Sequence, residues 1–79
     1  MNKEEILEKL QLIYTEIFNI DTEISITTSP NDIVSWDSLN HIILIKRIEE
    51  EFHIEFDLFE VIELKNTGDI VHTIQKQLS

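Results

Sequence analysis

The sequence predicts an all-α fold: a bundle of three main helices plus one short helix, with a long loop between the first and second helices. Three observations support it. Apolar residues recur at helical spacing in separate segments. Turn-forming residues separate those segments, and Asp or Thr stands where helices are expected to begin. With one glycine and one proline the chain offers no flexible linker, so residues 1–79 are predicted to form a single domain.

Composition and charge exclude several classes of protein. Sixteen acidic residues against six basic ones give a net charge of −10, which argues against nucleic-acid binding because phosphates require clustered Lys and Arg. Without cysteine, neither a disulfide nor a thiolate metal site can form. The N-terminal residues lack the apolar stretch of a signal peptide, and the longest apolar run, residues 42–45, is far too short to cross a bilayer. We therefore expect a cytoplasmic protein that does not insert into membranes. We also expect a monomer.

The first helix is predicted over residues 3–18, where apolar residues alternate with acids at helical spacing. Between Asn19 and Asp37 this period is lost among turn formers. Isoleucines scattered through this connection indicate that it packs on the core. The alternation of Ile24 and Ile26 leaves a short strand as an alternative.

Asp37 is the predicted N-cap of a second helix that runs to about Phe52, because its carboxylate can accept from free N–H groups of the first turn. Its predicted apolar face comprises Leu39, Ile42, Ile43, Ile45, Ile48 and Phe52. A one- to two-turn helix follows, with Asp57 as its cap, and Thr67 is the predicted cap of the last helix.

Catalytic and metal sites find little support. The histidines at 41, 53 and 72 lie in separate segments without the spacing of a zinc site. Asp37, Ser38 and His41 contain the residue types of a hydrolase triad, but neighbouring helical residues point about 100° apart and no glycine turn supplies an oxyanion hole. We therefore interpret His41 as a surface histidine and predict no metal site and no enzyme.

The segment Asp37-Ser38-Leu39 resembles the phosphopantetheine attachment site of the acyl carrier and peptidyl carrier proteins, which lies at the start of their second helix. The resemblance covers essentially the whole chain: a preceding helix, a long loop, a helix that ends at residues 48–52, then Ile54-Glu55-Phe56 and two further helices. It implies a stand-alone carrier protein with an acyl-carrier-like bundle.

The resemblance also implies the chemistry of the site. Ser38 would carry 4'-phosphopantetheine, transferred from coenzyme A by a phosphopantetheinyl transferase. The phosphodiester would lie at a helix N-terminus, which favours an anion. Leu39 is expected to point inward and fix the start of the helix, with Asp37 beside it. Trp36 either packs over the loop or lines the path of the arm.

The second helix is the expected partner surface, and it departs from the acidic surface of carriers in fatty acid synthesis. Near Ser38 it has Asn40 and Ile43, with Ile43 alternatively in the core. The predicted surface comprises Asn40, Ile43, Lys46, Arg47, Glu49 and Glu50. A less acidic surface near Ser38 implies a different set of partner enzymes. We expect acyl- or aminoacyl-loading ligases and acyltransferase or synthase enzymes of a specialised biosynthetic pathway.

The resemblance implies that the cargo is an acyl or aminoacyl thioester. Candidate lining residues for a shelter between the helices are Ile33, Leu39, Ile42, Phe52, Phe56, Val61 and Ile62. Bulky Phe52, Phe56 and Phe59 either restrict it to short cargo or serve only as packing. The alternative function is an unmodified acidic helical adaptor that binds a partner through the second helix and needs no hydroxyl at Ser38.

Overall fold

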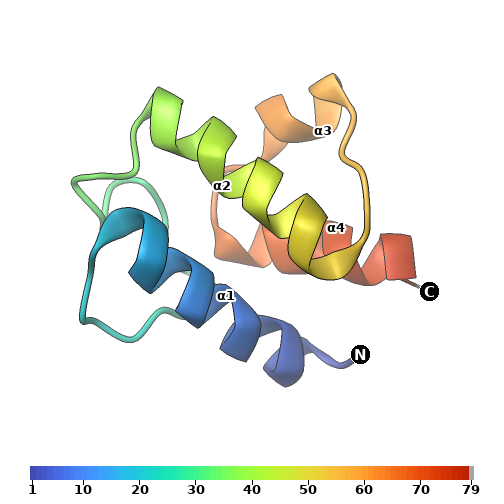
Figure 1. The fold of residues 1–79 in the computed structure, drawn as a ribbon, viewed down its shortest axis with the longest axis horizontal. Helices are drawn as coiled ribbons and strands as arrows, with labels where there is room; N and C mark the ends of the chain where they lie inside the picture. The colour runs from blue at the N-terminus through green and yellow to red at the C-terminus, as the bar shows by residue number, and fades with distance from the viewer. Residues whose placement is uncertain (79) are drawn as a thin grey trace.

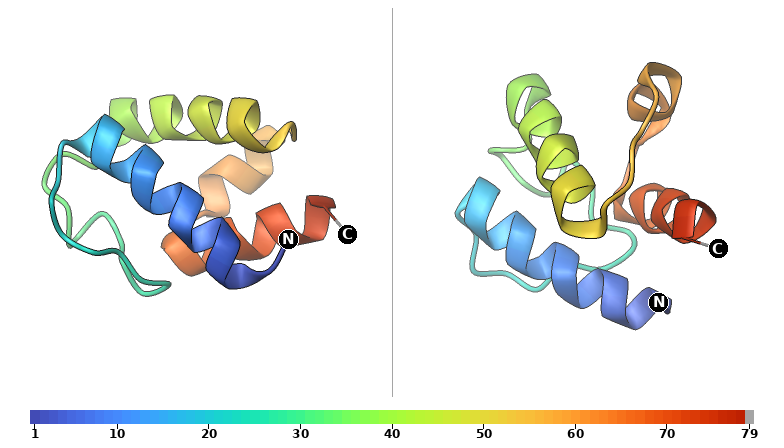
Figure 2. Two further views of the ribbon diagram at one scale, coloured as in Figure 1. Left: turned by 60° about the horizontal axis from the view of Figure 1, so that its bottom comes forward. Right: turned by 45° about the vertical axis from the view of Figure 1, so that its right-hand side comes forward.

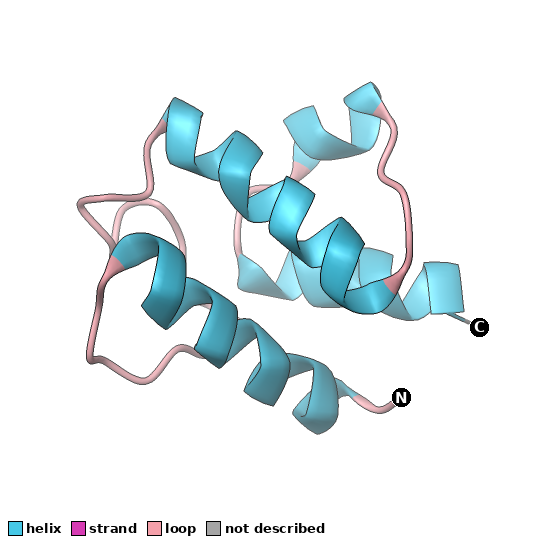
Figure 3. Ribbon diagram, in the orientation of Figure 1, coloured by secondary structure: helices cyan, strands magenta, loops and turns pink. Residues whose placement is uncertain are grey.

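Four helices and no strand make up the part of the chain that the structure describes, residues 1–78 (Figures 1 and 3). The computed structural model places them at α1 (Lys3–Phe18), α2 (Ser38–Phe52), α3 (Leu58–Glu63) and α4 (Thr67–Leu78). The predicted all-α bundle of three main helices and one short helix is confirmed, and the alternative strand at Ile24 and Ile26 does not form. Over these residues no helix combines the length and apolar character that a membrane crossing requires.

The helices alternate in direction around a shared core. α1 runs toward the end of the molecule that carries the long loop, and α2 and α4 run back from it (Figures 1 and 2). α3 connects the end of α2 to the start of α4 (Figure 1). The first residue of α2, Ser38, therefore lies at the loop end of the bundle.

Side chains cap the first three helices. The Asp37 carboxylate accepts a hydrogen bond from the backbone N–H of Asn40 at the start of α2. At α3, Asp57 accepts from the backbone of Glu60 while the Glu60 carboxylate accepts from the backbone of Asp57, which completes a capping box. An equivalent box at Asn2 begins α1. These contacts confirm both predicted aspartate caps.

The predicted cap at Thr67 is wrong. Thr67 is the first residue inside α4, and the Asn66 side chain accepts from the N–H of Asp69 instead. Thr67 is fully buried, and its hydroxyl donates to the carbonyl of Thr28 at 2.9 Å. Because that donor is used, the Tyr14 hydroxyl must donate to Thr67, at 3.0 Å. Thr67 thus ties the long loop and α4 to α1.

Burial raises the pKa of the Tyr14 hydroxyl well above its ordinary value. A group whose pKa is raised on folding stabilises the fold below its unfolded pKa, about 10 for tyrosine, and this contribution is lost as the pH rises further. We expect Tyr14→Phe to lower the free energy of unfolding by about 1 kcal/mol at pH 7.

The variant should also lose less stability than the wild type above about pH 10, because it lacks the titrating hydroxyl. Urea denaturation at pH 7 and pH 11 checks both points. Tyr14 is the single tyrosine, so the comparison isolates its titration from that of the lysines. An equal loss of unfolding free energy between pH 7 and pH 11 in the wild type and in Tyr14→Phe would contradict the raised pKa of Tyr14.

The long loop is fastened to the helices by hydrogen bonds as well as by apolar side chains. The Ser35 hydroxyl donates to the carbonyl of Phe18 at the end of α1. The N–H of Gly68 donates to the carbonyl of Ile26 at 2.8 Å, and a Cβ at position 68 would lie only 3.0 Å from that oxygen. This close approach explains the chain's single glycine. The loop packs on the core, as predicted, through Ile24, Ile33 and Trp36.

The core joins α1, α2, α4 and the loop. Its buried members are Ile6, Leu10, Ile13, Tyr14, Phe18, Ile24, Ile33, Trp36, Leu44, Ile48, Phe52, Ile54, Ile70, Val71 and Ile74. Three of them form an aromatic cluster of Tyr14, Phe18 and Trp36, with ring centroids 5.3–5.4 Å apart. The Trp36 indole is only 4% exposed, so packing of Trp36 in the core is confirmed. The cluster therefore packs beneath the start of α2.

Candidate functional site around Ser38

Ser38 lies exposed at the first position of α2, and its surroundings hold this first turn in place. Asp37 caps the turn by accepting from the N–H of Asn40 at 2.8 Å. The Asn40 amide donates to the carbonyl of Ser35, also at 2.8 Å. Two hydrogen bonds thus clamp the turn to the preceding loop. The Ser38 hydroxyl is presented to solvent from a fixed position.

The electrostatics at this position suit an anion. The first N–H groups of a helix lack intrahelical acceptors, and the helix dipole places partial positive charge at the N-terminus. Beyond the N-cap Asp37, whose carboxylate takes the Asn40 N–H, the first turn of α2 contains no acidic residue. A phosphate ester on the Ser38 oxygen would therefore meet N–H donors. The residues present fit a phosphodiester at Ser38.

A groove of about 450 Å³ opens beside Ser38 between α2 and α3. Its lining residues are Pro30, Trp36, Asp37, Ser38, His41, Ile42, Val61, Ile62 and Leu64. The groove can take an extended, uncharged group that begins at the serine oxygen, because most of these side chains are apolar.

Only part of the predicted apolar shelter lines this groove. Ile42, Val61 and Ile62 do so, whereas Ile33 and Phe52 are buried in the core. The suggestion that bulky phenylalanines restrict an interior cavity fails for Phe59, which is 76% exposed. Three lining residues were predicted neither for the shelter nor for the attachment site: Pro30, His41 and Leu64. Of these only His41 had a signal in the sequence, because it lies one helical turn after Ser38.

His41 is not the surface histidine that the sequence suggested. It is half-buried, and its Nδ1 atom accepts from the Trp36 indole N–H at 3.0 Å. Its Nε2 atom lies 3.3 Å from the carbonyl oxygen of Val61. Both ring nitrogens are therefore engaged, and neither is free to activate Ser38. This geometry removes the basis of the hydrolase alternative.

Residues 1–78 contain no cluster of three or more His, Asp or Glu side chains that could hold a metal ion.

Leu39 does not point inward. Its side chain is 70% exposed, and Ile43 is 45% exposed, which also excludes the core alternative for Ile43. Leu44, which was absent from the predicted apolar face, is fully buried in the core, whereas Leu39 and Ile43 are not. The exposed residues of α2 are Ser38, Leu39, Ile42, Ile43, Lys46 and Glu50. Among them Leu39, Ile43, Lys46 and Glu50 are spaced by four, three and four residues and share one face of the helix. We call these four residues the outer face of α2.

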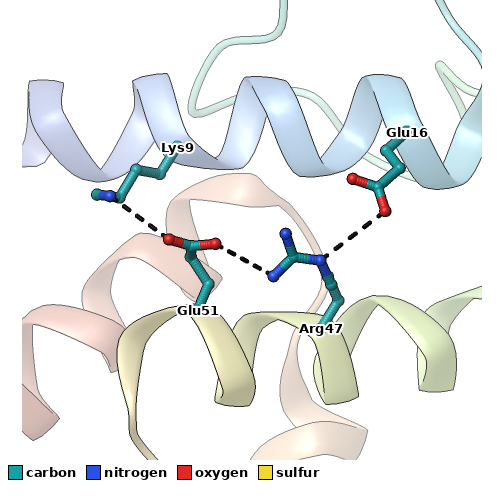
Figure 4. Close-up of polar contacts among 4 residues, drawn as sticks. All are labelled: Lys9, Glu16, Arg47 and Glu51. Atoms are coloured by element: carbon teal, nitrogen blue, oxygen red, sulfur yellow. Dashed lines mark hydrogen bonds and ion pairs between the residues drawn. The ribbon is translucent and has the colours of Figure 1, made fainter.

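Other members of the predicted partner surface make contacts within the molecule. The Glu49 carboxylate accepts from the backbone N–H of Phe56 at 2.9 Å. Arg47 donates to Glu51 at 3.1 Å and lies 3.9 Å from Glu16 of α1 (Figure 4). Both therefore help to hold the fold. Asn40 is likewise engaged with the loop.

An ion-pair network links α1 to α2 through Lys9, Glu16, Arg47 and Glu51 (Figure 4). The hydrogen bond from Arg47 lowers the pKa of the Glu51 carboxyl, and the nearby Lys9 charge adds to the effect. A carboxyl whose pKa is lowered on folding stabilises the fold above its ordinary acidic range, and the contribution is lost as the pH falls through its folded-state pKa. The network thus acts at neutral pH and fades in acid.

We expect Arg47→Ala to lower the melting temperature slightly at low salt, because it leaves two carboxylates near each other without their cation. Lys46→Ala is the matched control, since it removes the same charge from an exposed position.

Moderate salt should raise the melting temperature of the wild type by screening its net charge of −10. Thermal melts from low salt to about 1 M NaCl check both predictions. At high salt the melting temperatures of Arg47→Ala and Lys46→Ala should converge. An unchanged wild-type melting temperature would sink the screening argument.

Two curated relatives are similar to this chain over most of their length, although no family model matches it. The acyl carrier protein of Thermosynechococcus vestitus is 32% identical over 80 residues, which cover 100% of this chain and 99% of that relative. The acyl carrier protein of Clostridium acetobutylicum is 37% identical over 71 residues, which cover 89% of this chain and 92% of that relative.

The solved structures agree with the sequence relatives. The solution NMR structure of the holo acyl carrier protein from Geobacter metallireducens matches with a TM-score of 0.84 at 38% identity, over 91% of this chain and 84% of that one. The resemblance noted in the sequence is thereby confirmed, and the protein is a carrier rather than an enzyme. The chain belongs to the acyl carrier protein family.

Proposed function

We propose that the protein carries an acyl or aminoacyl group as a thioester on 4'-phosphopantetheine attached to Ser38, and presents that group to partner enzymes. The observation that supports this proposal most directly is the exposed hydroxyl of Ser38, within Asp37-Ser38-Leu39, at the first position of α2. A solved relative with 38% identity is a holo acyl carrier protein. The chain has no cysteine, so its reactive thiol would come from the attached group.

The residues around Ser38 have distinct parts in this proposal. Asp37 and Asn40 hold the first turn of α2 so that the serine oxygen faces solvent. The N-terminus of α2 favours the phosphate. The groove lined by Trp36, Ile42 and other apolar side chains accommodates uncharged parts of the arm or its cargo. Leu39 contributes to the outer surface instead of fixing the helix from within.

The outer face of α2 is the proposed contact surface for enzymes. Its leucine and isoleucine lie nearest to Ser38, and its lysine and glutamate lie further along the helix. Such a surface favours partners that match an apolar patch beside the serine, because complementarity sets association rate and specificity. The proposed partners are a phosphopantetheinyl transferase, an acyl- or aminoacyl-loading ligase, and an acyltransferase or synthase of a specialised biosynthetic pathway.

The same proposal covers the organisation of the chain. Residues 1–79 act as one carrier domain, monomeric and cytoplasmic. One core cluster joins three of the four helices to the loop, which supports a single folding unit.

The test is the intact mass of the protein after incubation with a broad-specificity phosphopantetheinyl transferase, Mg²⁺ and coenzyme A. The expected result is a gain equal to one phosphopantetheine group. A second carrier protein, incubated in parallel, shows that the transferase is active. No gain under these conditions would contradict the proposal and favour an unmodified adaptor that binds a partner through α2.

A further inference from the structure

His41 joins three parts of the molecule at the mouth of the groove. The Trp36 indole N–H can only donate, so Nδ1 of His41 must be the acceptor of their 3.0 Å hydrogen bond. The proton of the neutral ring then lies on Nε2, which donates to the carbonyl oxygen of Val61 in α3. The two rings are also nearly parallel, with centroids 6.1 Å apart and an interplanar angle of 21°. One side chain of α2 thus binds both the loop and α3.

The residues that flank α3 are fastened to the bundle, because Phe56 and Leu64 pack against the core and the Phe56 N–H donates to Glu49, but α3 itself has few such contacts. None of its side chains is buried, and Leu58, Phe59 and Ile62 are each at least 66% exposed. The capping box of α3 is local and does not attach it to the bundle. Figure 2 shows α3 standing beside α2 at the edge of the molecule. The hydrogen bond to Val61 therefore acts on an element that apolar burial holds only weakly.

Beneath His41 the molecule is filled. Trp36 stacks on Phe18 and meets Tyr14 edge-on, and the rings of Phe18 and Tyr14 are buried. His41 lies beside the Trp36 ring, nearly parallel to it, and continues this aromatic layer to the groove. A group that enters the groove meets this layer as its floor.

We propose that His41 is a positioning residue that latches α3 to α2 and to Trp36, and thereby fixes the width and the floor of the groove beside Ser38. By limiting how far α3 can move away from α2, the latch keeps cargo shallow on the apolar lining of this groove. This use of the groove rests on the proposed function, whereas the latch itself is a property of the unmodified protein.

Two variants separate the hydrogen bonds of His41 from its bulk. Gln can accept through its amide oxygen and donate through its amide nitrogen, so His41→Gln is the conservative variant. His41→Leu fills similar space and can do neither. In the unmodified protein, hydrogen exchange is measured by NMR at the amides of Val61 and Leu64 in and after α3, at the Trp36 indole, and at core amides of α1.

We expect His41→Leu to speed exchange at the α3 amides and the Trp36 indole by about tenfold relative to α1, and His41→Gln to stay within about threefold of the wild type. The ring ¹⁵N shifts of wild-type His41 should report a proton on Nε2. Equal acceleration of α3 and α1 would indicate general destabilisation and would overturn the latch, as would a proton on Nδ1.

The effect on cargo is then measured on the loaded protein. Cleavage of octanoyl and acetyl thioesters by hydroxylamine should proceed at similar rates in the wild type and in His41→Gln. In His41→Leu the octanoyl thioester should be cleaved at least about threefold more slowly, because a released α3 widens the groove and lets the longer chain enter it more deeply. An unchanged ratio would overturn the role in cargo. Absence of the arm on Ser38 would count against the proposed function alone, since the exchange measurements need no arm.

Discussion

Ser38→Ala is expected to abolish the gain in mass completely while leaving the fold intact. The hydroxyl oxygen is the atom to which the phosphate would be joined, so no product forms without it. The side chain is exposed at the first position of α2, where alanine is well tolerated. The free energy of unfolding should therefore change by no more than about 0.5 kcal/mol.

The chain offers a matched control three residues earlier. Ser35 carries the same hydroxyl, but it donates to the carbonyl of Phe18 at 2.9 Å. We expect Ser35→Ala to lower the free energy of unfolding by about 1 kcal/mol and to accept the arm normally. Intact mass and urea denaturation of both variants test this pair. A mass gain in Ser38→Ala, or its loss in Ser35→Ala with the fold retained, would place the attachment elsewhere.

The helices could be predicted from the sequence because their signals are local. Asp37 and Asp57 act within one turn of the residues they cap, and the apolar period of residues 3–18 repeats often enough to define a face. The position of Ser38 at the start of α2 follows from the same cap. The position of Ser38 at the N-terminus of α2 is thus set largely by residues adjacent to it in the sequence.

The buried face of α2 could not be predicted in full, because five apolar residues stand nearly together. Leu39 and the unbroken run at residues 42–45 offer apolar side chains on almost every side of the helix. Only packing against the rest of the core selects Leu44 and Ile45 as buried and leaves Leu39 and Ile43 outside. Periodicity carries no information where every position is apolar.

Long-range hydrogen bonds account for the other errors. Thr67 looks like a cap in isolation, but Tyr14, 53 residues away, draws its hydroxyl into the core. His41 looks like a surface residue until Val61, 20 residues later, is placed beside it. No local sequence pattern predicts hydrogen bonds between residues so far apart, so the roles of Thr67 and His41 could be found only in the structure.

Trp36→Ala should be the most damaging change to the fold among those considered. The indole is 4% exposed and packs against Tyr14 and Phe18, so its removal leaves a large cavity at the loop end. Such truncations cost about 3–5 kcal/mol. Domains of 79 residues have unfolding free energies of about 4–12 kcal/mol. The variant should therefore lose a large share of its stability and be partly unfolded at 37 °C.

Trp36→Phe separates the ring from its hydrogen bond. Phenylalanine keeps much of the aromatic contact with Phe18 but cannot donate to His41, so a smaller loss, about 1–2 kcal/mol, is expected. Urea denaturation must be followed by far-ultraviolet circular dichroism, because Trp36 is the single tryptophan. Equal stability of the alanine and phenylalanine variants would show that the aromatic cluster contributes little. The expected order, with alanine far below phenylalanine, would instead establish packing beneath the groove as the main support of the α2 N-terminus on which Ser38 stands.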